Sequence, residues 1–268
     1  MHSTPAEYAP PIDRLLTLGC PGCTDGEQKF WRTEPFADYA AMGIGPEHLP
    51  ELHRLAFDRQ LAEGDAPGSY GPVHAARAIG ALHPPELLAD LIELTRRLDR
   101  TNDDAWLEDM PNVLARFGGS AIPPLVRVAG DSREAFGARL YFVDTIERIA
   151  LEHPETRERV VAAFGKMLKY AAYGDPGINA HVISSLVELS AAEVLPAIRA
   201  AFATGRIDEY SCGPLKEIEE DIVLSPEEQK ARAQERNDRA EAELAAMSEE
   251  EAMAVMVERV RKMTEQMR

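Results

Sequence analysis

The motif Cys20-Pro21-Gly22-Cys23 is the local pattern in this chain that comes nearest to a known chemistry. Two thiolates separated by two residues can hold one zinc ion, and the same spacing occurs in redox-active dithiols. A zinc site needs two further ligands, and Cys212 is distant in the sequence. A redox motif usually opens a helix after a strand, and no such pattern is visible. We interpret the pair as part of a loop and keep Cys20 and Cys23 as weak metal candidates.

The other acid–base side chains have no catalytic arrangement. The seven histidines include no His-x-x-x-His pair, and His83 and His153 each precede a proline, which is typical of a turn. A run of carboxylates near residue 220 is suited to attracting cations or a basic peptide. Phosphate loops, nucleophile elbows and zinc-protease motifs are absent. The sequence therefore predicts a non-enzymatic protein without a cofactor. The carboxylates of that run are Glu217, Glu219, Glu220 and Asp221.

Composition narrows the possible partners. The 268 residues contain 46 acidic and 29 basic side chains, which gives a formal charge of -17. Nucleic-acid binding needs clustered Lys and Arg, so we expect no nucleic-acid partner and favour a protein or peptide partner, possibly a basic one. No apolar run approaches the roughly 18 residues of a membrane span, and no secretion signal opens the chain. Three cysteines are consistent with a reducing compartment, so we expect a cytoplasmic protein without a membrane partner.

Apolar residues recur at helical spacing, and strand-like alternation is scarce. The expected helices form pairs joined by short turns, at intervals typical of solenoid repeats. A small residue recurs near each turn, and a proline follows in the first turn of two second helices. The pairs cover residues 72–98, 106–128, 140–168 and 178–202, the small residues are Gly80, Gly118, Ala150 and Ser190, and the prolines are Pro124 and Pro196.

These helix pairs resemble HEAT-type repeats, in particular the short bacterial kind grouped with the lyase-associated HEAT-like repeats. The segments from Tyr8 to Leu16 and from Met42 to Leu52 are similar to the N-terminal part of bacterial HEAT-repeat proteins. The resemblance covers residues 8–224 and implies an all-α fold, an alpha-alpha superhelix of stacked helix pairs. It carries no catalytic motif.

Two flanking segments differ from the repeats. Residues 1–71 are predicted to form irregular capping helices over 12–18, 36–42 and 46–61, before the repeats of 72–224. Residues 225–268 form a charged extension, in which Ser225 and Glu228 make a capping box. Its last part, 253–267, is an amphipathic arm with methionines at coiled-coil spacing. This arm is expected to dock on its own chain, to bind a partner, or to mediate self-association.

The predicted function is a scaffold that binds another protein or peptide through a groove lined by the second helix of each pair. One alternative, suggested by the resemblance, is a lyase or chaperone-like protein that acts on a tetrapyrrole-bearing protein. Another is a HEAT-like DNA-repair glycosylase, which the acidic charge disfavours. The predicted partner-binding residues are Glu93, Arg96, Arg97, Arg127, Lys166 and Lys169 in the groove, with Met256, Val260 and Met263 in the arm.

Overall fold

The computed structural model describes residues 8–21, 23–24, 27–28, 35–64, 67–101, 103–246, 253, 257 and 261. The regular secondary structure within these ranges is helical apart from two short antiparallel strands, β1 (Cys23–Thr24) and β2 (Glu27–Gln28), so the all-α prediction is confirmed. No helix in these ranges is long and apolar enough to cross a bilayer. The chain divides into two units, Met1–Arg157 and Glu158–Arg268.

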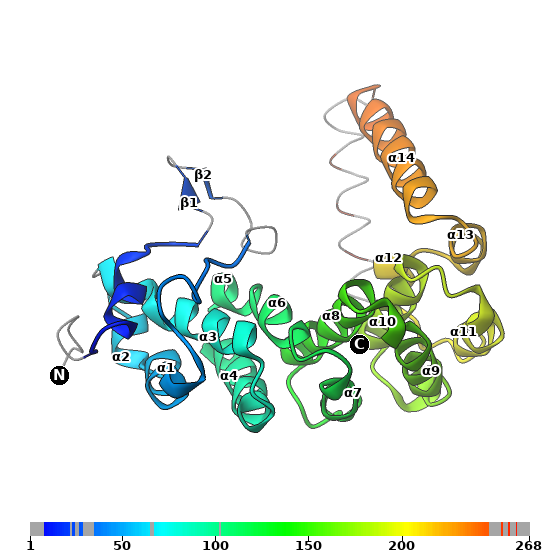
Figure 1. The fold of residues 1–268 in the computed structure, drawn as a ribbon. Coiled ribbons are helices and arrows are strands. Elements are labelled where there is room, and N and C mark those ends of the chain that lie inside the picture. The colour runs from blue at the N-terminus through cyan, green and yellow to red at the C-terminus, as the bar shows by residue number, and fades with distance from the viewer. Residues whose placement is uncertain are drawn as a thin grey trace. The chain divides into compact units, whose positions relative to one another are not determined.

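Each of the four predicted helix pairs contains two α-helices (Figure 1). In the first unit the α-helices are α1 (Leu49–Ala56), α2 (Arg59–Ala62), α3 (Gly71–Leu82), α4 (Leu88–Thr101), α5 (Asp104–Leu107), α6 (Met110–Ala115), α7 (Ile122–Ala129) and α8 (Phe136–Glu152). From the boundary onward they are α9 (Arg157–Leu168), α10 (Pro176–Glu188), α11 (Leu195–Phe202), α12 (Glu209–Cys212), α13 (Leu215–Asp221) and α14 (Pro226–Ala246). Short 3₁₀ helices cover Ile12–Thr17, Pro46–His48, Pro67–Tyr70, Pro85–Leu87, Gly118–Ser120, Pro154–Thr156, Ala171–Tyr173 and Ala192–Val194.

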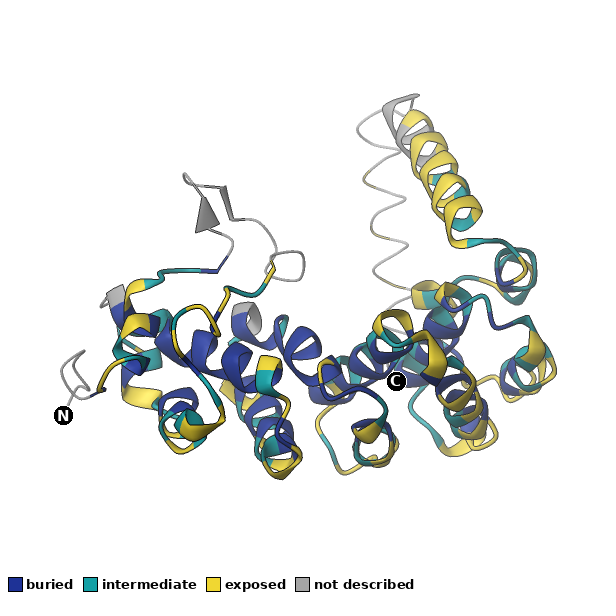
Figure 2. Ribbon diagram, in the orientation of Figure 1, coloured by how far each residue is buried: buried dark blue, intermediate teal, exposed yellow. Residues whose placement is uncertain are grey.

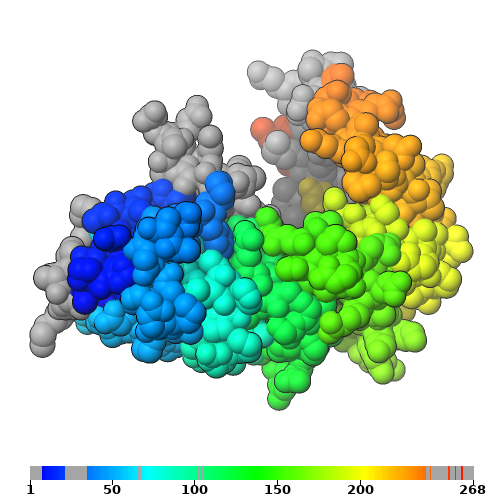
Figure 3. Space-filling view, viewed as in Figure 1, coloured from blue at the N-terminus to red at the C-terminus, as the bar shows by residue number. Residues whose placement is uncertain are grey.

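The first unit has an inner row of helices: α1 packs on α3, α3 on α6, and α6 on α8. Helix α3 is buried from Gly71 to Gly80, and every residue of α6 is buried, as expected for helices covered on all sides. Helix α4 instead buries one apolar stripe and leaves its opposite face polar (Figure 2). The space-filling surface from α3 to α8 is continuous (Figure 3).

Two of the predicted small turn residues adopt a left-handed backbone. Gly118 has φ +57° and Ser190 has φ +47°. Gly80 has a different role, because it lies inside α3, where a Cβ atom would come within 2.9 Å of the Val113 carbonyl oxygen of α6. Its small size therefore permits the close approach of two helices.

The N-terminal helices are shorter than predicted. The segment expected to be helical over 36–42 forms turns, so that prediction was wrong. The helix expected over 46–61 is divided into α1 and α2 at Asp58, because the Asp58 carboxylate caps α2 by accepting a hydrogen bond from Leu61 N at 3.0 Å. The Tyr8 hydroxyl donates to the other oxygen of Asp58 at 2.7 Å.

In the second unit, α10 packs on α12 and α11 on α13. Helix α14 begins where the capping box predicts: Ser225 N donates to Glu228 Oε2 at 2.8 Å, and Glu228 N donates to Ser225 Oγ at 3.3 Å. It follows α13 in the chain and is drawn in orange in Figure 3. Most of the expected arm at 253–267 lies outside the described residues, although Met253 and Val257 are described and exposed.

Candidate functional site

The predicted groove residues Glu93 and Arg96 lie on the polar face of α4 and are tied to their own chain. The Arg96 guanidinium donates to both carboxylate oxygens of Glu134, at 2.8 and 2.6 Å. Glu93 accepts from Arg100 at 2.9 Å and from Arg96 at 3.3 Å. These bonds raise the pKa of Arg96 and lower the pKa of Glu93. Both side chains are therefore already neutralised within the fold.

Arg97, the next residue on α4, is in a different environment. Its guanidinium carbon lies 5.1 Å from the centre of the Phe57 ring, which is cation–π geometry. Burial lowers the pKa of Arg97, and the neighbouring positive charge of Arg59 lowers it further. Within the described ranges, Arg97 forms no ion pair with a carboxylate. The Arg97 guanidinium is thus half-buried against Phe57, and its N–H groups can donate to a ligand.

A cavity of about 300 Å³ adjoins Arg97, and we call it the Arg97 pocket. Two of its lining charges cancel, because Arg59 Nε and Glu63 Oε1 form an ion pair at 2.5 Å. Trp106 is 2% exposed, and its indole N–H has no acceptor in the part of the chain that is described. A planar guanidinium fixed against a ring is suited to bidentate binding of a carboxylate. The remaining lining residues are Ala62, Leu98, Thr101 and Asp103.

The other predicted groove cations are exposed. Arg127 lies on α7 in the first unit, whereas Lys166 lies on α9 and Lys169 just after it, both in the second unit. The predicted arm residues Met256, Val260 and Met263 lie outside the described residues.

The cysteine motif is oxidised at Cys20, which forms a disulfide, whereas Cys212 has a free thiol. The side chain of Cys23 is outside the described part. A cysteine in a disulfide offers no thiolate to a metal ion. The nearby His74 is also engaged at both ring nitrogens, by the Tyr39 hydroxyl at 3.1 Å and by the Gly19 carbonyl oxygen at 3.0 Å. Among the described residues no three His, Cys, Asp or Glu side chains are grouped to hold a metal ion.

A buried ion pair between Arg77 and Asp109 was missed by the sequence reasoning. Arg77 Nε and Nη2 donate to the Asp109 carboxylate at 2.7 and 2.9 Å, and both side chains are almost fully buried. Asn112 adds a hydrogen bond to Asp109 at 2.9 Å. The available signal was the position of Arg77, four residues after Val73 and therefore on the apolar face of the expected helix. The arrangement joins α3 to the start of α6.

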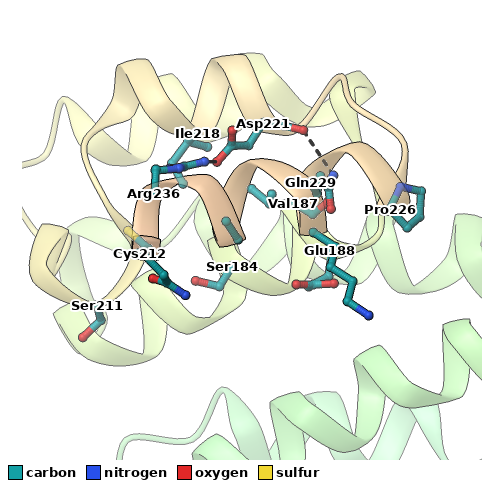
Figure 4. A pocket seen from close by; sticks show the side chains of 13 residues that line it. Ser184, Val187, Glu188, Ser211, Cys212, Ile218, Asp221, Pro226, Gln229 and Arg236 are labelled. Atoms are coloured by element: carbon teal, nitrogen blue, oxygen red, sulfur yellow. Dashed lines mark hydrogen bonds and ion pairs between the residues drawn. The ribbon is translucent and has the colours of Figure 1, made fainter. Parts of the chain in front are cut away.

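The second unit has a larger cavity, of about 800 Å³, between α10, α12, α13 and α14. Figure 4 shows Arg236 and Gln229 of α14 pointing toward Asp221 of α13. The Gln229 Nε2 group, which has two N–H donors, lies within hydrogen-bond distance of four surrounding oxygens, and the nearest is the Val187 carbonyl oxygen at 2.8 Å. The Cys212 thiol lines the same cavity. Burial raises its pKa to about 12, helped by the charges of Asp208 and Glu209, so it is a poor nucleophile.

The chain matches no protein-family model, no curated protein and no solved structure.

Proposed function

We propose that this chain is a non-enzymatic scaffold, a HEAT-like stack of helix pairs, which binds another protein or peptide through the polar faces of its second helices. The succession α3, α6 and α8, with α4 and α7 packed beside it, supports the stacked arrangement in the first unit. A stack of this kind leaves long rows of outward side chains available for recognition.

The observation that carries the proposal is Arg97. Its guanidinium lies against the Phe57 ring at the edge of a pocket. Glu63 and Asp103 act on its pKa from nearby, but it forms no ion pair with a described carboxylate, in contrast to Arg96 beside it. Aromatic and arginine side chains at pockets are the usual anchors of protein interfaces. We expect the Arg97 pocket to receive a carboxylate of the partner, from an acidic side chain or a chain terminus.

The test uses peptides selected by the full-length protein from a random phage-displayed library and then measured by isothermal titration. Arg97→Glu should weaken the selected peptides at least tenfold, about 1.4 kcal/mol, because it replaces a donor with a repelling charge. Arg133→Glu makes the same charge change at a fully solvated side chain between α7 and α8, outside the second helices, and should alter affinity less than about twofold.

Arg97→Lys adds a further control, because it keeps the charge and loses the planar guanidinium. An intermediate loss is expected for this variant. Equal affinities of wild type and Arg97→Glu, or a library from which no peptide is enriched, would contradict the proposal. Thermal unfolding followed by circular dichroism checks that the variants remain folded.

A further inference from the structure

The described side chains through which helix α14 contacts α13 are polar. Of its described side chains, only Gln229, Arg232 and Arg236 are half-buried, and the others are exposed. The three are spaced by three and four residues, so they lie on one face of the helix. The apolar stripe that normally holds a surface helix is replaced here by an amide and two guanidinium groups.

The two arginines meet three carboxylates of α13, Glu217, Glu220 and Asp221, which we call the acidic face. Arg236 donates to Glu217 at 2.8 Å and also to Asp221. Arg232 donates to Glu220, and its Nε lies 3.2 Å from Asp221 Oδ1. The hydrogen bond to Arg232 lowers the pKa of Glu220, as expected for a carboxylate that is held ionised.

The fit of α14 on this face is incomplete. Asp221 Oδ1, Gln229 Oε1 and Arg236 Nε are inaccessible to water, and each has no hydrogen-bond partner in the described part of the chain. The 3.2 Å contact of Asp221 Oδ1 with Arg232 is an ion pair that lacks hydrogen-bond alignment. Leaving buried polar atoms unpaired costs free energy, which undocking would recover through water. The carboxylate face is thus occupied by a helix that a better-matched helix can displace.

We propose that the acidic face of α13 is a docking surface for a basic helix of a partner protein, and that α14 is its intramolecular competitor. The partner helix presents two arginines four residues apart, as Arg232 and Arg236 do, because that spacing places two guanidinium groups over carboxylates on consecutive turns. The chain's charge of -17 favours approach of such a helix. This inference rests on the proposed function only in treating the chain as a binding protein, and it uses a different surface from the Arg97 pocket.

The test measures binding of a fluorescein-labelled synthetic peptide with the sequence of residues 226–246 to the full-length protein, by fluorescence anisotropy. The wild type should bind it weakly, because its own α14 competes. The variant Arg232→Glu with Arg236→Glu should bind it at least tenfold more tightly, since its own helix is repelled from the acidic face.

The control variant is Lys230→Glu with Gln234→Glu, which adds negative charge at exposed positions on the opposite side of the same helix. It should bind the peptide as weakly as wild type. We call Arg232→Glu with Arg236→Glu the released variant. Adding Glu217→Gln and Glu220→Gln to it should abolish the gain in peptide affinity. Equal binding by the released variant and the control, or a gain that survives loss of the two carboxylates, would overturn the proposal.

A second measurement avoids the dependence on variants. Excess unlabelled peptide added to wild-type protein should speed hydrogen exchange at the protein's own α14 amides, because the peptide displaces that helix. Unchanged exchange at saturating peptide would overturn the proposal. Arg97→Glu should leave both measurements unchanged, so failure at one surface is distinguishable from failure at the other.

Discussion

The Arg77 guanidinium and the Asp109 carboxylate form a buried, two-point ion pair between α3 and the residue that precedes α6. Arg77 is 2% exposed and Asp109 is fully buried. The pair lies where the inner helices of the first unit cross, and Asn112 hydrogen-bonds to the same carboxylate.

Asp109→Ala should lower the free energy of unfolding by about 3–5 kcal/mol, because it leaves Arg77 charged and buried without its partner. Urea unfolding followed by circular dichroism measures the loss. The double variant Arg77→Met with Asp109→Leu should recover most of it, because no buried charge remains. The account would be contradicted if the stability lost by the double variant equalled the sum of the stabilities lost by Arg77→Met and Asp109→Leu alone.

Stability should also depend on pH through His74. Burial lowers the pKa of His74 from its ordinary value of 6.5, and the charge of Arg77 lowers it further, while the Gly19 carbonyl and Asp109 act in the opposite direction. In the unfolded chain His74 binds a proton at a higher pH than in the folded chain. Folding stability is therefore lost as the pH falls from about 6.5 toward the lowered pKa.

The measurement compares wild type with His74→Gln in urea at several pH values. The stability advantage of the wild type should be full above pH about 6.5 and should shrink below it. An advantage that stays constant across this range would show that His74 does not titrate differently in the two states.

Two glycine substitutions should change stability in opposite directions. Gly80→Ala places a methyl group 2.9 Å from the Val113 carbonyl oxygen, so α6 must shift, and a net loss of about 1 kcal/mol is expected despite the better helix propensity of alanine. Gly165→Ala in α9 meets only Val194 Cγ1, at 3.4 Å, and should gain about 0.5–1 kcal/mol. Chemical unfolding of both variants tests the pair, and two losses of equal size would refute the packing argument.

Cys212 should be almost inert in the folded protein. Its pKa of about 12 leaves very little thiolate near neutral pH, and thiolate is the form that iodoacetamide alkylates. Mass spectrometry of the Cys212 peptide should show slow alkylation of native protein and rapid alkylation in urea. Similar rates in the two conditions would mean that the thiol is not buried.

Much of the helical content was predictable because apolar spacing fixes which face of a helix is buried. The stripe from Leu88 to Leu98 identified α4, and Ser225 with Glu228 identified the start of α14. The helix expected over 36–42 failed because local spacing does not reveal tertiary contacts. Phe36 contacts the Arg77 and Arg116 guanidinium groups, and the Tyr39 hydroxyl contacts His74, both from turns.

The candidate site was predictable only in part. Arg97 was identified as an outward polar residue on a second helix, but its neighbour Arg96 could not be distinguished from it. The difference comes from Glu134 and Phe57, which are distant in the sequence and adjacent in the fold. Docking of α14 was equally hidden, since the helix lacks the apolar stripe on which such a prediction depends.

Helix α14 is held through Gln229, Arg232 and Arg236, so it can detach without exposing an apolar stripe among its own described side chains. Its detachment exposes the carboxylates and backbone carbonyls that it contacts, together with the wall of the adjoining cavity, which includes Val187 and Ile218. Dissolved ions weaken such a fastening, because they screen its partly exposed charges. We therefore expect the fraction of molecules with α14 detached to rise with ionic strength.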